Sequence, residues 1–129
     1  MGYRELKLNP KGIKTGDCAI RAVAAALSAS WDNAYKQLAD AGFRLKVSMS
    51  ETEAVESVLL NNGFSIGKIK VPRGSHRPTV ASFTREHPDW VSVLRVANHL
   101  VACSNGIYVD IWDSGECSVY KYWYKEIRH

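Results

Sequence analysis

The chain has 129 residues, of which 46% are hydrophobic and 23% are charged, and its formal net charge is +4. This composition is typical of a globular domain and excludes a disordered or fibrous protein. The length favours a single domain over residues 1–129 with its own hydrophobic core. The longest apolar stretch, residues 22–27, is too short to cross a bilayer, and the N-terminus has no apolar signal-peptide core, so we expect no membrane partner.

The basic residues and the cysteines are scattered along the chain. Lys and Arg form no run of about five or six like charges, which disfavours a nucleic-acid partner although the pI is near 9.0. The three cysteines, Cys18, Cys103 and Cys117, cannot all pair within one chain and lack the CxxC spacing of a zinc site. We therefore expect a reducing, cytoplasmic compartment, with no metal and no cofactor.

The first part of the chain predicts an extended segment and a helix. Residues 1–14 are polar and are expected to form an extended arm or short strand that leads into a loop. A helix starts at Cys18, because apolar residues recur at the helical spacing at positions 20, 23, 24 and 27. Its alanine-rich sequence allows close packing against a sheet, so we expect this helix to be the most buried one.

Two more helices are predicted next along the chain. The second has Ser30 as its capping residue, carries a stripe of apolar residues and stops at Gly42. The third opens with the S-x-x-E capping box of residues 50–53 and stops at residues 62–63.

A short strand, a loop and a fourth helix follow. Residues 64–71 alternate imperfectly between apolar and polar and predict a short strand, and residues 73–78 are expected to form an exposed loop. The fourth helix is predicted over residues 79–86, capped by Thr79 and ended before Pro88.

From Trp90 to Tyr124 the apolar residues have a period of two, which is typical of strands. The Asn105-Gly106 pair predicts a tight type I′ hairpin turn, because both turn residues need a positive φ. Helices followed by an antiparallel sheet indicate an α+β fold, with the Cys18 helix packed on the sheet. The predicted strands cover residues 90–96, 99–103, 107–112 and 117–124.

Cys18 is the candidate nucleophile because of its place at the start of a helix. A cysteine attacks as its thiolate, and unpaired backbone N–H groups and the helix dipole favour negative charge there. Such a nucleophile needs a base within hydrogen-bond reach and a third group that orients the base. His99, at the start of a predicted strand, is the candidate base, and Asp110, on the next strand, is the candidate orienting group.

The expected hairpin register bears on this pairing. Around a two-residue turn at 105–106, Val101 faces Asp110, so His99 and Asp110 become diagonal neighbours on one face of the sheet. Diagonal neighbours are about 7–8 Å apart, a gap that two side chains leaning together can close. A bulge or a longer loop would shift the parity and bring Asp113 to His99 instead, so Asp113 is the second candidate.

Each candidate also has a purely structural interpretation. Cys18 has the character of a small buried hydrophobic residue, His99 that of a hydrogen-bonded histidine at a sheet edge, and Asp110 that of a turn carboxylate. Asp17 and Arg21 are four apart on one helix and predict a first-turn ion pair. A sharper interpretation is that Arg21 holds the loop before Cys18 in shape.

The remaining cysteines and histidines fit structural roles. Cys103 and Cys117 lie in apolar strands and are expected to be inert core residues. His76 lies in a basic loop and His87 precedes a proline, so we expect both to be solvated.

Three segments together resemble small phage and bacterial proteins of the papain-like cysteine peptidase family, with the bacteriocin-leader processing peptidases as more distant relatives. They are Gly16-Asp17-Cys18-Ala19-Ile20-Arg21-Ala22, Asn98-His99-Leu100-Val101-Ala102 and Tyr108-Val109-Asp110-Ile111-Trp112-Asp113-Ser114-Gly115. The likeness covers nearly the whole chain in element order. It implies a papain-like fold with Cys18 as nucleophile, His99 as general base and then acid, and Asp110 as orienting group. It also implies a peptide or protein substrate.

The sequence departs from this family's pattern at one position. Peptidases of this type usually carry a glutamine shortly before the cysteine as an oxyanion donor, and this chain has Gly12 there. The backbone N–H of Cys18, together with the Thr15 hydroxyl or Lys14, would then have to stabilise the oxyanion. Each missing donor costs a factor of ~10²–10³ in rate.

We therefore expect a papain-like thiol hydrolase, a peptidase or isopeptidase, that acts by acyl transfer through a Cys-His-Asp triad. The first alternative is a non-catalytic papain-like fold that binds a protein partner, with its cysteine merely buried. The second is a basic accessory protein that binds nucleic acid, which salt-dependent binding to DNA would reveal.

Overall fold

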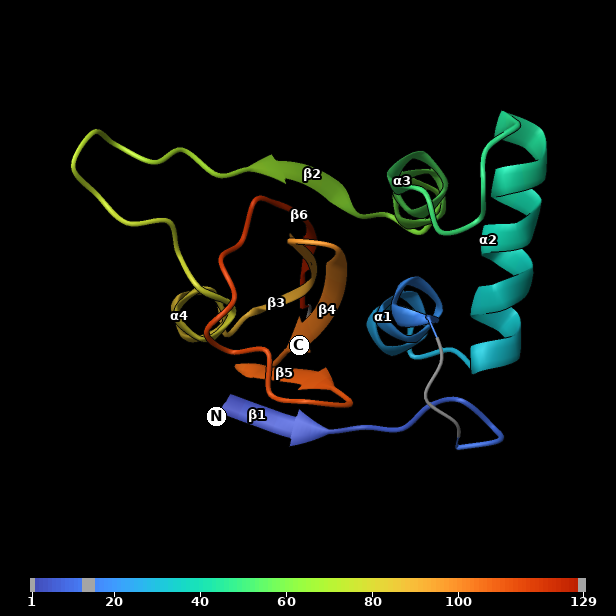
Figure 1. Cartoon of the computed structure of the whole chain (residues 1–129), viewed down its shortest axis with the longest axis horizontal. Coiled ribbons are helices and arrows are strands. Elements are labelled where there is room, and N and C mark those ends of the chain that lie inside the picture. The colour runs from blue at the N-terminus through green and yellow to red at the C-terminus, as the bar shows by residue number, and fades with distance from the viewer. Residues whose placement is uncertain (1, 13–15, 128–129) are drawn as a thin grey trace.

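The computed structural model describes residues 2–12 and 16–127, which form an α+β fold of four helices and one six-stranded sheet (Figure 1). This fold class agrees with the prediction. The helices are α1 (Cys18–Leu27), α2 (Trp31–Leu45), α3 (Thr52–Asn61) and α4 (Val80–Glu86). The strands are β1 (Gly2–Glu5), β2 (Ser65–Lys68), β3 (Trp90–Val96), β4 (His99–Ser104), β5 (Ile107–Asp110) and β6 (Lys121–Glu126).

The sheet is not formed by the C-terminal strands alone. Its order is β1-β5-β4-β3-β6-β2, and every neighbouring pair is antiparallel except β1 and β5, which are parallel. The expectation of a purely C-terminal antiparallel sheet was therefore incomplete. A parallel pair needs a long connection rather than a tight turn, and here most of the chain lies between the two strands, so no local signal reveals the pairing.

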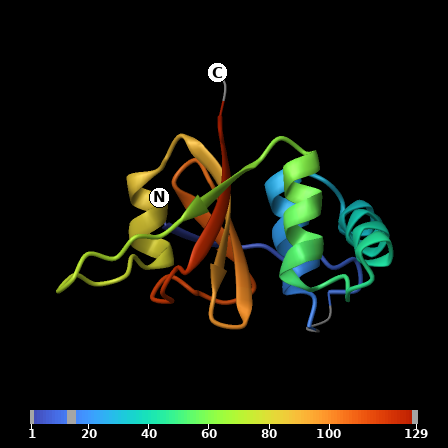
Figure 2. The ribbon, with the colours of Figure 1, turned by 90° about the horizontal axis from the view of Figure 1, so that it is seen from above.

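Helices cover both faces of the sheet. Figure 2 shows α1, α2 and α3 on one side and α4 on the other. The first face is centred on Val23 of α1 and Trp123 of β6, both fully buried, and the second on Val80 and Phe83 of α4. The alanines of α1 let its backbone approach the sheet closely, as the sequence predicted. This close approach brings the N-terminus of α1 to the ends of β4 and β5.

The β4–β5 hairpin has the predicted turn and register. Asn105 and Gly106 have φ values of 54° and 76°, as a type I′ turn requires. Ala102 pairs with Val109, and the pairing continues in step to the turn. The strand β5 ends at Asp110, two residues earlier than expected, so Asp110 is its last residue.

The ends of two helices differ from the predictions. Helix α2 continues past Gly42 to Leu45, and Lys46, whose φ is 60°, is its C-cap. Gly42 is buried, and a Cβ there would lie 2.9 Å from the carbonyl oxygen of Val47, so this glycine allows close packing instead of ending the helix. At α3 the predicted capping box of residues 50–53 does not form, because Glu51 is the N-cap and makes no side-chain cap bond.

The start of α4 agrees with the prediction. The Thr79 hydroxyl accepts a hydrogen bond from the backbone N–H of Ser82 at 3.1 Å, and the backbone N–H of Thr79 donates to the Ser82 hydroxyl at 2.9 Å. Thr79 also forms a β-bridge with Ser118. Backbone hydrogen bonds also join Cys117 to Val80 and Val119 to Pro78. Residues 117–119 thus pair with the start of α4, and β6 begins at Lys121, later than the sequence predicted.

Within residues 2–12 and 16–127, no helix combines the length and the hydrophobicity of a transmembrane segment.

The two capping positions give a test of the fold. We expect Thr79→Ala to lower the free energy of unfolding by about 1 kcal/mol, because it removes a formed N-cap bond. Urea denaturation followed by circular dichroism measures this loss. Ser50→Ala is the matched control and should change stability by less than about 0.5 kcal/mol. Equal losses in the two variants would contradict the cap assignment.

Candidate active site

Cys18 is the first residue of α1 and is partly buried. Its pKa is lowered, above all by a hydrogen bond with His99, and also by a backbone hydrogen bond from Leu100 and the positive charge of Arg21, although burial opposes this. The unpaired N–H groups of the first helical turn act in the same direction. Cys18 therefore has the environment of a reactive thiol.

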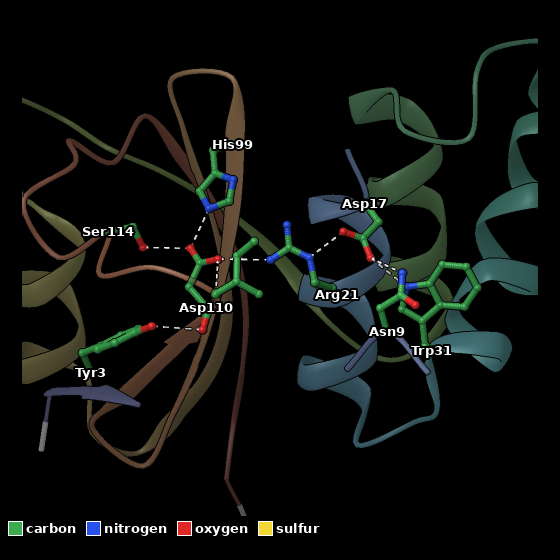
Figure 3. A network of polar contacts seen from close by, with 9 residues as sticks. Tyr3, Asn9, Asp17, Arg21, Trp31, His99, Asp110 and Ser114 are labelled. Atoms are coloured by element: carbon green, nitrogen blue, oxygen red, sulfur yellow. Dashed lines mark hydrogen bonds and ion pairs between the residues drawn. The ribbon is translucent and has the colours of Figure 1, made fainter. Parts of the chain in front are cut away.

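His99 and Asp110 are in direct contact. The Nε2 atom of His99 lies 2.6 Å from Oδ2 of Asp110 (Figure 3). The carboxylate also accepts hydrogen bonds from the backbone N–H of Ile111 at 2.8 Å, the Ser114 hydroxyl at 3.0 Å and Nη1 of Arg21 at 3.2 Å. Burial raises the pKa of Asp110, but the hydrogen bond and charge of His99, together with the hydrogen bonds from Ile111 and Ser114, outweigh it and lower the pKa, so the carboxylate stays ionised.

The two partners of His99 favour its protonated form. Burial lowers the pKa of His99, but the hydrogen bonds and charges of Asp110 and Cys18 outweigh it and raise the pKa to about 9. Because Nε2 is bonded to Asp110, Nδ1 is the ring nitrogen left for the sulfur of Cys18. A raised imidazole pKa beside a lowered thiol pKa favours a thiolate–imidazolium pair near neutral pH.

The structure brings Asp110, and not Asp113, to His99. The carboxylate of Asp113 accepts a hydrogen bond from the Tyr108 hydroxyl at 2.6 Å and one from the backbone N–H of Gly115 at 3.0 Å. His99 begins β4 and Asp110 ends β5, so the two lie at the same end of the hairpin. Their side chains close the gap between diagonal neighbours.

Arg21 connects this pair to the helices. Its Nε atom lies 2.7 Å from Oδ1 of Asp17, so the predicted ion pair is present, and its Nη1 atom reaches Asp110. Asp17 also accepts hydrogen bonds from Nε1 of Trp31 at 2.9 Å and from the Asn9 amide at 3.3 Å. Figure 3 shows the resulting chain of contacts from α2 through α1 to the β4–β5 hairpin. The sequence predicted the pair of Asp17 with Arg21, but not the contact of Arg21 with Asp110.

The side chain of Asp17 is committed to this chain of contacts. It is the N-cap of α1 but makes no cap hydrogen bond, and only 4% of the residue is exposed. Burial raises its pKa, but the donors Trp31 and Arg21 outweigh it and lower the pKa. The N-terminal N–H groups of α1 are thus left without a carboxylate cap.

Cys18 and His99 open onto one cavity of about 430 Å³ between α1, α3 and the ends of β3 and β4. Its walls combine apolar groups with hydroxyl, amide and guanidinium groups. The lining residues are Gly16, Cys18, Ser50, Thr52, Val55, Arg95, Val96, Asn98, His99, Leu100 and Trp123. Sequence reasoning missed Arg95 and Ser114, because neither carries a local signal for a site.

Gly12 has no side chain that could serve as the oxyanion donor. Gly12 is exposed, has a φ of 65° and does not line the cavity. Lys14 and Thr15, the other candidates, lie outside the described residues.

The other cysteines and histidines correct two expectations. Cys103 is buried as predicted, and burial raises its pKa to about 11, but Cys117 lies outside the strands and is only partly buried against the core. His76 is exposed as predicted. His87 is not solvated: its ring stacks on Trp90, 3.9 Å between centroids, and burial lowers its pKa. The cause is tertiary, since the C-cap of α4 folds over an aromatic cluster.

Among the described residues, no group of three or more His, Cys, Asp or Glu side chains is arranged to hold a metal ion. No family model matches this sequence, and no curated protein or solved structure shows a significant match to it.

The choice between the two aspartates can be tested by titration. We expect Asp110→Asn to lower the pKa of His99 from about 9, because it removes the negative charge that stabilises the imidazolium. Asp113→Asn is the matched control and should leave this pKa unchanged. NMR titration of the imidazole signals measures both, with the dispersion of the amide spectrum as the check on folding. A drop in the pKa of His99 in the Asp113→Asn variant alone would show that Asp113, and not Asp110, is the partner of His99.

Proposed function

We propose that this protein is a papain-like cysteine hydrolase, a peptidase or isopeptidase, with Cys18 as nucleophile. The observation that carries the proposal is the 2.6 Å contact of His99 with Asp110, together with the opening of His99 and Cys18 onto one cavity. A nucleophile, a base and an orienting carboxylate in this order define the geometry of nucleophilic acyl transfer. The order of the elements, a helix-borne cysteine before a hairpin with His and Asp, also supports the papain-like assignment.

The acylation step uses the thiolate–imidazolium pair. The Cys18 sulfur attacks the carbonyl carbon of the scissile bond, and the carbonyl oxygen takes the negative charge next to the backbone N–H of Cys18 at the helix N-terminus. Protonated His99 then donates its proton to the leaving amine. The C–N bond breaks, the amine departs, and a thioester links the acyl group to Cys18.

Water completes the reaction. Neutral His99 accepts a proton from the water molecule that attacks the thioester carbon, and the C–S bond breaks. The acid product leaves, and the thiolate–imidazolium pair forms again. Asp110 stays ionised through both steps and holds the ring by Nε2, while Arg21 holds Asp110 in place.

Gly12 favours one alternative, a non-catalytic papain-like fold that binds a protein partner. Without a side-chain oxyanion donor at this position, catalysis depends on the remaining donors and loses a factor of ~10²–10³ per missing donor. The three free cysteines support a reducing compartment, and we place the protein in the cytoplasm on this ground.

Alkylation of the thiol decides between the hydrolase and this alternative. We expect iodoacetamide at pH 7 to label Cys18 at least about tenfold faster than Cys117, because the thiolate is the reactive form. Mass spectrometry of the digested protein measures both rates in one sample. The substitution His99→Gln should lower the rate of labelling at Cys18 by about tenfold and leave the rate at Cys117 unchanged. Labelling of Cys18 at or below the rate of Cys117 would end the hydrolase proposal.

Hydrolysis of a quenched fluorescent peptide library should give a bell-shaped dependence on pH. Activity rises as Cys18 loses its proton, below the ordinary thiol pKa of 9.0, and falls near pH 9 as His99 loses the proton that the leaving group needs. Alkylation of Cys18 should not fall above pH 9, since it needs only the thiolate. Asp110→Asn should move the falling limb to lower pH, and an unmoved limb would contradict the assignment of that limb to His99.

A further inference from the structure

The cavity beside Cys18 carries an unbalanced positive charge. Of its lining residues, which belong to the described part of the chain, Arg95 alone is permanently charged, and none is Asp or Glu. His99 is also positive when protonated, but Asp110 and the Cys18 thiolate balance it. Arg95 has no such partner there.

The strand register places Arg95 on the cavity side of the sheet. Arg95 pairs with Leu100 of β4 and Lys121 of β6. Arg95 is two residues from Val93 on the same strand, so both side chains lie on the same face of the sheet, and Val93 belongs to the core under α1 and α3. The Nε atom of Arg95 is buried and has no hydrogen-bond partner. A buried donor without a partner is uncommon in proteins and requires an explanation.

The nearby carboxylates are already engaged. Glu56 of α3 accepts hydrogen bonds from Lys121 at 2.8 Å and from Nε1 of Trp123 at 3.0 Å. Asp17 and Asp110 are held by Arg21. Across the described ranges, no ion pair joins Arg95 to an acidic side chain. The guanidinium therefore has both the charge and the free donors to bind an anion that enters the cavity.

We propose that Arg95 determines specificity by binding a carboxylate of the substrate beside the bond that Cys18 attacks. This carboxylate is either the side chain of an acidic residue or the free C-terminus of a peptide. A guanidinium binds a carboxylate through two parallel hydrogen bonds, and partial burial strengthens the contact. The hydroxyls of Ser50 and Thr52 and the Asn98 amide add donors on the same walls. The inference rests on the proposed hydrolase function for its meaning, but its test does not need hydrolysis.

The first test compares two alkylating agents that differ in charge. Iodoacetate carries a carboxylate and iodoacetamide does not, so the ratio of their rates at Cys18, divided by the same ratio at Cys117, measures the preference of the cavity for an anion. We expect Arg95→Gln to lower this normalised ratio by about 3–10-fold, the effect of one charged contact. Raising the salt concentration should lower it in the wild type as well.

Two controls accompany this test. Arg73→Gln removes the same charge from an exposed loop outside the cavity and should leave the ratio unchanged. Arg95→Lys keeps the charge and should retain most of the preference, which guards against a loss caused by misfolding. Equal normalised ratios in the wild type and in Arg95→Gln would overturn the proposal.

The second test uses peptides and separates the two sources of the carboxylate. Matched peptides carry Glu or Gln beside the cleavage site and end in either a free carboxylate or an amide. Preference for Glu in amidated peptides assigns an acidic side chain, and preference for the free end assigns the C-terminus. Arg95→Glu should reverse the preference toward Lys.

The outcomes distinguish the inference from the function on which it rests. An anion preference in alkylation without cleavage of any peptide would contradict the proposed hydrolase function and support the carboxylate site at Arg95. Cleavage that shows no preference for either carboxylate, and that is the same in Arg95→Gln, would contradict the carboxylate site and support the hydrolase function.

Discussion

The bridge that Arg21 makes between Asp17 and Asp110 is the interaction on which the rest of the site depends. It joins the start of α1 to the end of β5, two elements far apart in sequence, and both carboxylates are almost fully buried, with side chains 4% and 2% exposed. A buried carboxylate without a charged partner is costly, and this guanidinium is a charged partner of both. Loss of one partner of such a buried pair typically costs about 3–5 kcal/mol. The same contact that stabilises the fold fixes where Asp110 lies relative to the helix.

The charges at this end of the molecule alternate in sign. Asp17, Arg21, Asp110 and His99 follow one another through direct contacts, and the thiolate form of Cys18 continues the series. Each group therefore favours the charged form of the next. This arrangement explains how a histidine that burial alone would keep neutral has a raised pKa. It also explains why the carboxylate at the N-cap of α1 does not disfavour a thiolate nearby, because Arg21 neutralises it.

Sequence reasoning succeeded where short-range physics decides the structure. The Asn105-Gly106 turn fixes the register of its hairpin, and that register is enough to make His99 and Asp110 neighbours. It failed where packing between distant segments decides. The parallel partner of β5, the second contact of Arg21 and the cavity position of Arg95 all depend on contacts between segments far apart in the sequence, which local patterns do not reveal.

The parallel pairing of β1 with β5 has a consequence for the growing chain. The first strand is synthesised long before its partner, and Cys18 likewise precedes its histidine and its aspartate, so a ribosome-bound fragment holds a thiol with ordinary chemistry. The groups that lower the pKa of Cys18 include His99 and Leu100 of β4, so this shift arises only after that strand has joined the sheet. The lowered thiol pKa is therefore a property of the folded chain and is absent from nascent or denatured molecules.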